Sequence, residues 1–481
     1  MLTVSCLSCG APVAFRSHAS VMAVCEFCRT TVYKDAGAVR DLGKVSEVLE
    51  DYSPIQLGTA GVHGGRPFTV IGRIQLRYDA GMWNEWYLLF EDGEGGWLGE
   101  ASGQYTLTRK RALPKGFPDF DAVRMGGQHE LGMGQFVVSD KRVADCVGGQ
   151  GELPFRLGEG WQARVADLRR GSTFATVDYS DERPVMYSGG AVTLEGLKCQ
   201  LLRDDDAIKA SAGRYRGRLE ALDCPSCGTA IRYLPGMATN LVCQACATRL
   251  DASTPQAEVL AAGERHAKVA FTLALGLAAK IGAHEYRVLG AMKRKDDDGE
   301  EWSEYLLYSV RGGFFWLVET SEGWWRSDVL DEWPEPGTPA VPRVQHRKAS
   351  YERTLDYPAR VTYAAGAFNW QVKVGDRVRV REFEHGQASL SAESTDAELT
   401  WSRSTHVAED QVRAWFKLPI APKPAKRSGA GANLKWHFFL WIMGLNFIPL
   451  MMNFGETLMW LILGLAAVVL PPTILDKDSK S

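Results

Sequence analysis

The chain has 481 residues, which is too long for one hydrophobic core, and about 150 residues per domain gives roughly three domains. Its formal net charge of −3 and isoelectric point near 6.3 exclude a general electrostatic attraction to nucleic acid. The mean hydropathy of −0.18 is that of a soluble protein, but it averages over an uneven chain.

Four cysteines near the N-terminus recur with the same spacing in the middle of the chain. Each set reads Cys-x2-Cys-x15-Cys-x2-Cys, and the second set follows the first by 218 positions. Two converging knuckles offer one Zn²⁺ four tetrahedral thiolates, whereas a thioredoxin-like redox motif uses one pair. We therefore predict two structural Zn²⁺ sites, with the ligands Cys6, Cys9, Cys25 and Cys28, and Cys224, Cys227, Cys243 and Cys246.

The cysteine usage also indicates a compartment. The residues before Cys6 have neither a basic start nor an apolar run, so we expect no signal peptide and a reducing environment. In such an environment paired knuckles bind metal rather than oxidise. The remaining Cys146 and Cys199 are expected to be buried thiols.

The segment after the first ribbon is a polar connector, in which residues 39–49 offer a short helix. Strands separated by glycine turns follow, and the pattern Trp83–Phe90 with Trp97–Glu100 recurs as Trp302–Ser309 with Trp316–Glu319. Each copy predicts a β-hairpin. Further strands are predicted at 134–139, 163–168, 173–179 and 184–187, and at 372–374, 378–383, 388–392 and 398–401.

Two connecting segments separate the repeats. Residues 204–222 form a charged linker without apolar periodicity, and residues 255–268, rich in Ala and Glu, offer a short helix.

The C-terminal region changes character. A tether rich in Pro, Gly and basic residues precedes residues 436–475, which carry one formal charge, Glu456. This length fits two membrane spans, with a single span from 457 to 475 as the alternative. The basic residues before it place the soluble side in the cytoplasm, at the inner (cytoplasmic) membrane.

The predicted fold is therefore mainly β, with two repeats of a zinc ribbon and a small β-sandwich or barrel, and a C-terminal transmembrane helical hairpin. The expected domains are zinc ribbon 1 (1–34), β-domain 1 (52–205), zinc ribbon 2 (222–252), β-domain 2 (267–418), the basic tether (419–435) and the transmembrane segment (436–475).

The sequence contains no motif for a metalloprotease, a serine hydrolase, a phosphate loop or a dinucleotide site, so we assign no catalytic residue. The best acid–base candidates are Glu85 with Glu100 and Glu304 with Glu319, on adjacent strands. Alternatively these acids form ion pairs with Arg73, Arg77 or Lys293. The histidines lack ligand-like spacing and are expected at the surface: His266, His284, His346, His385 and His406.

The aromatic residues follow strand periodicity near turns. We expect most of them in the core, with the alternative that those at turn edges form a surface for protein contact. They are Trp83, Trp86, Trp97, Tyr105, Trp302, Trp316, Trp324 and Trp325.

These motifs resemble a bacterial family, domain of unknown function 4178. The resemblance rests on Leu-Gly-x-x-Gly, Phe68–Arg73, Trp83–Leu88 and Trp97–Glu100, and it covers both β-domains. The second copy departs from it at Ala291 and Tyr305. The resemblance implies zinc-ribbon knuckles and C-terminal membrane segments. It also implies a gene close to those of phage-shock-like proteins, small membrane proteins and polyamine-synthesis enzymes. No catalytic residue is assigned in the family.

We therefore expect a membrane-tethered, cytoplasm-facing binding scaffold with two zinc-stabilised β-modules, in a phage-shock-like membrane-remodelling or stress system, that holds a protein partner. One alternative is an enzyme that uses Glu85 or Glu304 on membrane-proximal or polyamine-related substrates. The other is a zinc-ribbon regulator that binds nucleic acid. The basic residues of the ribbons are scattered and form no basic stripe, which argues against this alternative. The oligomeric state is left open.

Overall fold

The computed structural model describes residues 2–35, 38–44, 48–78, 81–101, 103–157, 160–214, 216–255, 257–261, 269–336, 342–386 and 388–419. The chain divides into two units, Met1–Lys417 and Leu418–Ser481. Of the second unit, the predicted tether beyond residue 419 and the predicted transmembrane hairpin lie outside the described residues. None of the helices in the described part has the length and hydrophobicity needed to cross a bilayer.

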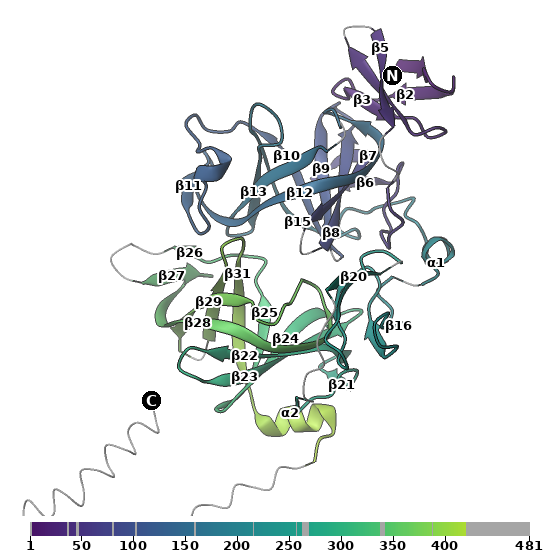
Figure 1. The fold of residues 1–481 in the computed structure, drawn as a ribbon. Helices are drawn as coiled ribbons and strands as arrows, with labels where there is room; N and C mark the ends of the chain where they lie inside the picture. Colours follow the sequence, from purple (N-terminus) through teal and green to yellow (C-terminus); the bar gives the residue numbers. More distant parts are fainter. Residues whose placement is uncertain are drawn as a thin grey trace, which may run out of the picture. The chain divides into compact units, whose positions relative to one another are not determined.

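The first half of the first unit contains barrel 1, a closed ring of eight antiparallel strands (Figure 1). The order around the ring is β7-β12-β13-β14-β15-β10-β9-β8, and the pairing of β12 with β7 closes it. The strands are β7 (Arg66–Tyr78), β8 (Gly81–Phe90), β9 (Gly95–Ala101), β10 (Gln104–Arg111), β12 (Gln135–Leu153), β13 (Gln162–Arg170), β14 (Thr173–Asp178) and β15 (Val185–Val192), with β6 (Ala60–His63), η1 (Phe120–Ala122) and β11 (Gln128–Glu130) outside the ring.

Barrel 2 repeats this ring in the second half, in the order β22-β28-β29-β30-β31-β25-β24-β23. Its strands are β22 (His284–Asp296), β23 (Glu301–Ser309), β24 (Gly313–Thr320), β25 (Gly323–Val329), β28 (Ala349–Phe368), β29 (Arg377–His385), β30 (Ala388–Ser394) and β31 (Leu399–Val407). The elements β21 (Ala278–Ile281), β26 (Glu335–Pro336), β27 (Arg343–His346) and α2 (Glu409–Phe416) flank the ring.

Each barrel is preceded by a four-cysteine ribbon, ribbon 1 or ribbon 2, that extends its sheet. In ribbon 1, Met22 pairs with Leu153 at the end of β12, and in ribbon 2, Leu241 pairs with Ala367 at the end of β28. The ribbons comprise β1 (Leu2–Ser5), β2 (Pro12–Phe15), β3 (Met22–Val24), β4 (Thr30–Asp35) and β5 (Ala38–Lys44), and β16 (Glu220–Asp223), β17 (Ala230–Tyr233), β18 (Asn240–Val242), β19 (Arg249–Asp251) and β20 (Glu258–Ala261).

Both faces of the wall of barrel 1 are packed, because alternate residues of a strand point to opposite faces. Leu76, Tyr87 and Trp97 belong to an interior cluster that also takes in Met22 of ribbon 1. The outward face forms two further clusters, one beneath residues 55–57 and 194–202, and one beneath residues 113–131.

The two longest strands, β12 and β28, were only partly predicted, because their glycines resemble turn signals. Gly151 and Gly366 instead mark the close approach where each barrel closes. A Cβ atom at Gly151 would lie 2.2 Å from the Ile71 carbonyl oxygen, and one at Gly366 would lie 2.2 Å from that of Leu289. Only glycine admits this contact.

Three connecting segments differ from the prediction. Residues 38–44 form strand β5, which pairs with β4, so they are not helical. Residues 258–261 form strand β20, which pairs with β19, and are not helical either. Residues 262–268 lie outside the described part. The charged linker at 204–222, for which we predicted no helix, contains helix α1 (Asp205–Ala212). The Ala207 N–H donates to the Asp204 carboxylate at 2.6 Å as an N-cap.

The predicted hairpins and most predicted strands are confirmed, since β8–β9 and β23–β24 pair as expected. The strand predicted at 372–374 is absent, because those residues form a loop between β28 and β29.

Candidate functional sites

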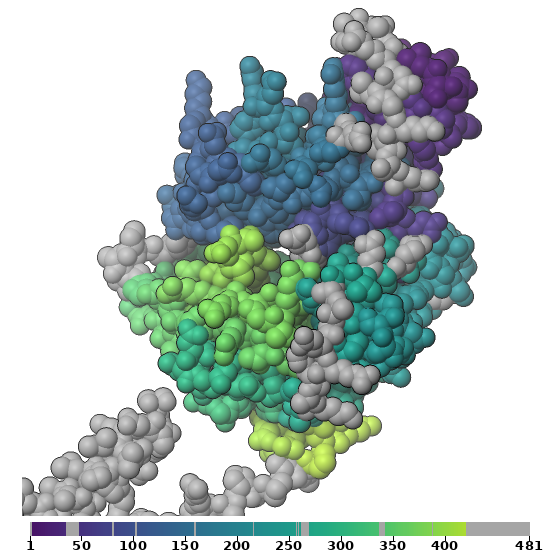
Figure 2. Space-filling view, in the orientation of Figure 1, coloured from purple at the N-terminus to yellow at the C-terminus, as the bar shows by residue number. Residues whose placement is uncertain are grey.

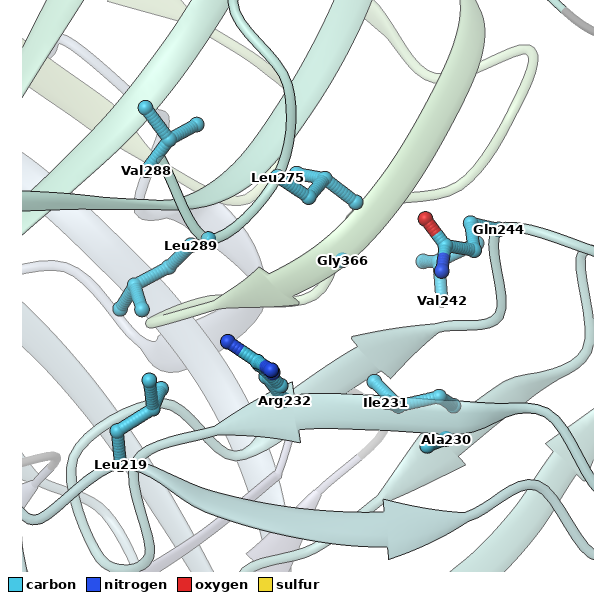
Figure 3. Close-up of a pocket in the computed structure, with 11 residues that line it drawn as sticks. Leu219, Ala230, Ile231, Arg232, Val242, Gln244, Leu275, Val288, Leu289 and Gly366 are labelled. Carbon is cyan, nitrogen blue, oxygen red and sulfur yellow. The ribbon is translucent and has the colours of Figure 1, made fainter. Parts of the chain in front are cut away.

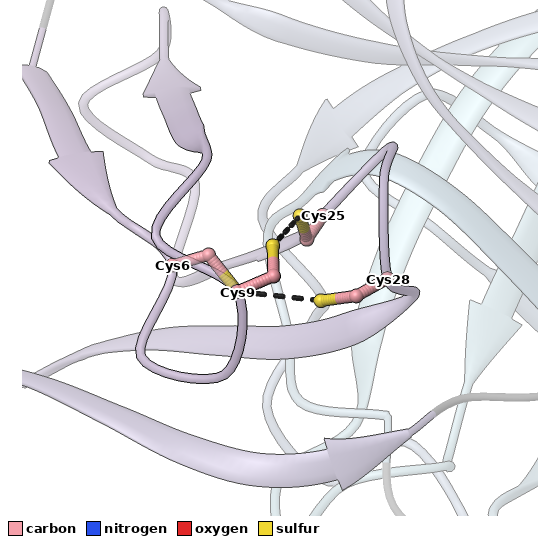
Figure 4. A group of neighbouring side chains, drawn as sticks. All are labelled: Cys6, Cys9, Cys25 and Cys28. Carbon is pink, nitrogen blue, oxygen red and sulfur yellow. Dashed lines mark hydrogen bonds between the residues drawn. The ribbon is translucent and has the colours of Figure 1, made fainter.

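The four cysteines of ribbon 1 converge from the two knuckles (Figure 4). The Cys6 and Cys28 Sγ atoms lie 3.5 Å apart, those of Cys9 and Cys25 lie 3.7 Å apart, and all four lie within 4.8 Å of one another. Zn–S bonds of about 2.3 Å in a tetrahedron place sulfur atoms about 3.8 Å apart. The sulfur positions therefore fit a tetrahedral metal ion.

Ribbon 2 repeats this geometry. The Cys224 and Cys246 Sγ atoms lie 3.7 Å apart, those of Cys227 and Cys243 lie 3.6 Å apart, and all four again lie within 4.8 Å. Both clusters are thus consistent with zinc. All four donors of such a site come from the protein, so the metal would stabilise the fold rather than activate water.

The backbone of each knuckle explains why the four sulfur atoms can converge. The Gly10 N–H donates to the Cys6 carbonyl at 2.8 Å, and the Arg29 N–H donates to the Cys25 carbonyl at 2.9 Å. Both turns need a left-handed residue, with φ of 75° at Gly10 and 63° at Arg29. Glycine takes this conformation freely, whereas Arg29 is held there by the turn.

The two ribbons differ in the residues exposed at their tips. Ribbon 1 is the purple part of the space-filling view (Figure 2). In ribbon 1, Leu7 and Phe27 sit inside the Cys-x2-Cys knuckles and are 57% and 74% exposed. The residues at the same knuckle positions of ribbon 2 are Pro225 and Ala245. Within 216–255, which the structure describes completely, no large hydrophobic side chain is exposed. Only ribbon 1 therefore presents an apolar tip.

A small cavity of about 110 Å³ lies between ribbon 2 and barrel 2 (Figure 3). Ile231 and Val242 of the ribbon face Leu275 and Leu289 of the barrel, and Arg232 supplies the charged group. The lining is mostly apolar, and the volume holds only a few water molecules.

The predicted acid pairs do not form, because their members lie on opposite faces of the sheet. In the β8–β9 pairing, Glu85 lies opposite Gly99, whereas Glu100 lies opposite Asn84. In barrel 2, Glu319 lies opposite Ser303 in the same way, one position from Glu304. Two neighbouring strand residues point to opposite sides. Glu85 and Glu304 therefore face the barrel interior, and Glu100 and Glu319 face outward.

Glu100 belongs to a buried polar cluster on the outer wall of barrel 1. Its carboxylate accepts hydrogen bonds from Trp86 Nε1 at 3.1 Å and Tyr105 OH at 3.2 Å, and Arg216 Nη2 of the inter-repeat linker lies 3.2 Å away. Beside it, Arg73 forms a buried ion pair with Asp51. A buried network of this kind, fully satisfied, holds the covering segments on the barrel.

The alternative ion-pair partners were also only partly right. Arg73 does pair with an acid, but with Asp51, and Lys293 Nζ lies 3.1 Å from Glu301 rather than from Glu304. Barrel 2 keeps a smaller version of the outer cluster, in which Glu319 accepts from Tyr305 OH at 2.6 Å.

Glu85 lies half-buried inside barrel 1. Trp83 Nε1 donates to Glu85 Oε1 at 2.9 Å. Burial, with a smaller contribution from the carboxylates of Asp167 and Asp178, raises the pKa of Glu85 to about 8, although the hydrogen bond from Trp83 lowers it. Burial also raises the pKa of Asp178, which accepts the Ser180 N–H at 2.9 Å. The interior of barrel 1 thus gathers three carboxyl groups.

Barrel 2 also gathers acids in its interior, around Arg294, whereas the inward arginine of barrel 1 is Arg142, opposite Val165. Arg294 Nη1 lies 2.8 Å from Glu393 Oε2 and 3.5 Å from Glu304 Oε1, and Trp302 Nε1 donates to Glu304 Oε1 at 2.7 Å. Glu382 completes the set and accepts from Tyr357 OH at 2.7 Å. Burial raises the pKa of Glu304, while Arg294 lowers it.

Sequence reasoning missed most of these interior groups. Asp167 and Asp178, Glu382 and Glu393, and Arg294 lie at inward positions of β13, β14, β29, β30 and β22. A charged residue repeated at the inward register of a predicted strand is the signal that could have revealed them.

The remaining expectations have mixed outcomes. His346 is buried, contrary to prediction, whereas His385 and His406 are exposed, and His266 lies outside the described residues. Cys146 and Cys199 are free thiols but only half-buried. The aromatic residues are mostly core: Trp86, Trp97, Tyr105, Trp316 and Trp324 are buried, and Trp83, Trp302 and Trp325 are half-buried.

Comparison with protein-family models gives a match to a domain of unknown function, DUF4178, over residues 56–194 and 274–409. The two matched stretches correspond to the two barrels. No curated protein and no solved structure matches the chain. Because the two matches together cover more than half of the chain, this protein belongs to the DUF4178 family.

Proposed function

We propose that this chain is a binding scaffold, in which two zinc-braced barrels face the cytoplasm and an apolar C-terminal segment tethers them to the inner membrane. The observation that carries the proposal is the difference between the ribbon tips. Ribbon 1 exposes Leu7 and Phe27 where ribbon 2 has Pro225 and Ala245.

Exposed aromatic and aliphatic residues on a rigid support are typical of protein contacts. The four thiolates around each metal would hold both knuckles in one conformation, so little conformational freedom is lost when a partner binds. The tether would raise the local concentration of a bound partner at the membrane. The two acids of each predicted catalytic pair lie on opposite faces of the sheet. This arrangement supports binding rather than chemistry that needs two adjacent carboxylates.

The experiment uses the full chain with a photo-crosslinking amino acid at position 27 and, as the matched control, at position 245. We expect one membrane-associated protein to crosslink from position 27 and not from position 245, and the additional substitution Leu7→Ser to abolish the crosslink. Equal labelling from both positions, or none from either, would contradict a partner site on ribbon 1.

The tether is tested separately by fractionation. The full chain is expected with the membranes, and a variant that ends after Lys417 is expected in the soluble fraction. Recovery of the full chain in the soluble fraction would remove the membrane part of the proposal.

One observation favours a second candidate, an enzyme that acts through Glu85 or Glu304 on membrane-proximal or polyamine-related substrates. A carboxyl group with a pKa of about 8 is protonated at neutral pH and suits a general acid. The double substitution Glu85→Gln and Glu304→Gln separates the two: loss of the cellular phenotype with the position-27 crosslink intact supports chemistry.

A further inference from the structure

The outer wall of barrel 2 carries a row of cations on three neighbouring strands. Lys295 of β22 lies opposite Arg360 of β28, and Arg360 lies opposite Arg377, the first residue of β29 (Figure 1). The row faces outward, because Arg294, next to Lys295, faces the interior acids. Arg360 and Arg377 are exposed, and none of the three cations forms an ion pair with an acid of the described residues. Like charges directly opposite one another destabilise a sheet, so this row is a cost to the fold.

Barrel 1 has no such row at the same register. Arg77 of β7 lies opposite Asp145 of β12, and Asp145 lies opposite Gln162, the first residue of β13. Gln162 Nε2 donates to Asp145 Oδ1 at 2.7 Å. An acid and an amide therefore stand where barrel 2 has two arginines, and the row of cations distinguishes the second repeat from the first.

The acids near the row lie where they leave its arginine end uncompensated. Glu301 lies opposite Lys295, and the turn at 296–300 adds further acids at that end of the row. At the other end, the Asp356 carboxylate lies 2.6 Å from Arg379 Nε and is thereby occupied. The net positive charge is therefore concentrated at the end of the row on β28 and β29.

The loop that joins β28 to β29 brings an apolar side chain to this end of the row. The Gly375 N–H donates to the Val361 carbonyl at 2.8 Å, and the Val361 N–H donates to the Asp376 carbonyl at 2.9 Å. Val361 and Asp376 are the chain neighbours of the two opposed arginines, so the end of the loop is fixed beside them. Val374, immediately before Gly375, is 51% exposed.

In barrel 1 the corresponding loop covers its aromatic residue. Phe155, two residues after β12, contacts Trp97 of β9 and Trp161, with ring centroids 5.8 Å and 5.1 Å away. The rings of Phe155 and Trp161 are stacked, with an angle of 12° between their planes. Trp161 therefore shields the loop, and all three side chains are buried or half-buried.

In barrel 2 this cover is missing. Trp370, two residues after β28, contacts Trp316 of β24 with ring centroids 4.9 Å apart. The residue immediately before β29 is Asp376, where barrel 1 has a tryptophan before β13. The Asp376 carboxylate accepts the Lys373 N–H at 2.7 Å and so closes the loop. Without an aromatic cover, Trp370 is 37% exposed.

An exposed tryptophan and valine beside two arginines have the chemistry of a membrane-contacting surface. Tryptophan favours the headgroup level of a bilayer, where its ring is partly apolar and its N–H meets water. Arginine forms bidentate hydrogen bonds with phosphates. Two apolar side chains are few for a stable protein interface, which takes about 20–30 residues a side, whereas shallow insertion assisted by cations suits a bilayer surface.

We propose that barrel 2 docks on an anionic lipid bilayer through the surface formed by Arg360, Trp370, Val374 and Arg377. The two arginines would contact lipid phosphates, and the two apolar side chains would lie at headgroup level. The lipids would thus supply the negative charge that the fold does not provide. This contact is made by the barrel wall and goes beyond the C-terminal tether, whose insertion would not depend on the charge of the lipids.

The test uses the full, zinc-loaded chain with a fluorescent amino acid at position 374 and vesicles whose headgroups carry a spin label. The vesicles consist of phosphatidylcholine alone or of an equal mixture with phosphatidylglycerol. Sedimentation with the neutral vesicles reports the tether, and quenching of the fluorophore reports the docking surface. We expect quenching with the anionic vesicles only, and its loss at about 1 M salt, which screens surface charge. If the tether does not insert, the chain should sediment with anionic vesicles alone and quenching should remain.

The combined substitutions Arg360→Gln and Arg377→Gln should reduce the ratio of docked to undocked chain by about thirtyfold, at about fivefold for each arginine. The matched control, Arg124→Gln with Arg183→Gln, removes the same charge from exposed positions of barrel 1 and should leave the quenching unchanged. Absence of quenching with anionic vesicles, equal quenching with neutral vesicles, or quenching that survives the paired substitutions in β28 and β29 would overturn the proposal. Zinc content and near-ultraviolet circular dichroism establish the fold of each variant, and the salt dependence of the wild-type chain tests the proposal without any substitution in the row.

Discussion

The interiors of the two barrels share three acids but place an arginine at different positions, Arg142 in barrel 1 and Arg294 in barrel 2. Barrel 2 places Arg294 between Glu304 and Glu393, and barrel 1 places Leu76 at the same register beside Glu85 and Asp178. Buried carboxylates are costly unless they are paired or protonated. Arg294 therefore stabilises the charges of Glu304 and Glu393. In barrel 1, burial instead raises the pKa of Glu85 and Asp178 and so favours their protonated forms.

This comparison also separates the residues that maintain the fold from those that we assign to binding. The closing glycines and the docked ribbons occur in both repeats, so they maintain the architecture. The ribbon tips and the position of the interior arginine differ between the repeats, and we place partner binding at the tip of ribbon 1. Four experiments test this division, in order of decreasing expected effect.

The largest effect is expected from removing a metal ligand. Cys25→Ser should unfold ribbon 1 and open the end of barrel 1 that Met22 and Leu153 close, whereas Cys243→Ser should do the same to barrel 2. Metal binding to small zinc sites is worth about 10–16 kcal/mol. Each variant should retain about one zinc ion per chain instead of two, with fast hydrogen exchange confined to its own ribbon. Two retained ions would contradict the assignment.

The next effect concerns the cation of barrel 2. Arg294→Met keeps a long side chain but leaves Glu304 and Glu393 facing each other, which should destabilise the protein by about 3–5 kcal/mol. Leu76→Met in barrel 1 is the matched control, with an expected cost below about 1.5 kcal/mol. Urea unfolding measures both, and equal costs would remove the proposed difference between the barrels.

A smaller effect is expected from the pH dependence of Glu85. Its folded-state pKa of about 8 lies above the ordinary value of 4.5, so the folded protein binds this proton more tightly than the unfolded chain does. The resulting stabilisation is fully present below pH 4.5 and is lost as the pH rises through 8, at up to about 1.4 kcal/mol per pH unit.

The variant Glu85→Gln cannot titrate at this position. Relative to this variant, the wild-type protein should therefore lose stability between pH 6 and 9 in thermal unfolding. Parallel curves for the two proteins would show that Glu85 ionises normally.

The smallest effect is expected at Tyr357, whose hydroxyl donates to Glu382 at 2.7 Å. Tyr357→Phe removes this hydrogen bond and should cost about 1 kcal/mol in urea unfolding. The counterpart position in barrel 1 carries Arg142, so Arg142→Gln, which breaks its ion pair with Asp140, should cost more than Tyr357→Phe. A larger cost for Tyr357→Phe than for Arg142→Gln would show that the Arg142–Asp140 ion pair stabilises barrel 1 less than the Tyr357–Glu382 hydrogen bond stabilises barrel 2, contrary to our prediction.

Local patterns made the two four-cysteine clusters, the duplication and the hairpins predictable. Knuckle spacing and turn residues act within about 20 residues, so the eight cysteines and the β8–β9 hairpin could be placed correctly. The position of α1 was also signalled by Asp204 and Gly213, the capping residues that the linker prediction overlooked.

Contacts that arise when the barrel closes could not be predicted in this way. β8 and β14 lie on opposite sides of the ring, so the meeting of Glu85 with Asp178 depends on the whole strand order. Strand alternation could have shown that Glu85 and Glu100 lie on opposite faces of the sheet. That conclusion needs the register in which β8 pairs with β9, which the sequence alone did not show.

The most direct test of the difference between the barrels is the pKa of Glu85 itself, measured by carbon-13 NMR of glutamate carboxyl groups in the full chain, with Glu85→Gln identifying the resonance. The account predicts a midpoint near pH 8 in the wild-type protein and a midpoint well below it in Leu76→Arg, where a guanidinium lies beside the carboxylate. A wild-type midpoint near 4.5, or one that Leu76→Arg leaves unchanged, would contradict it.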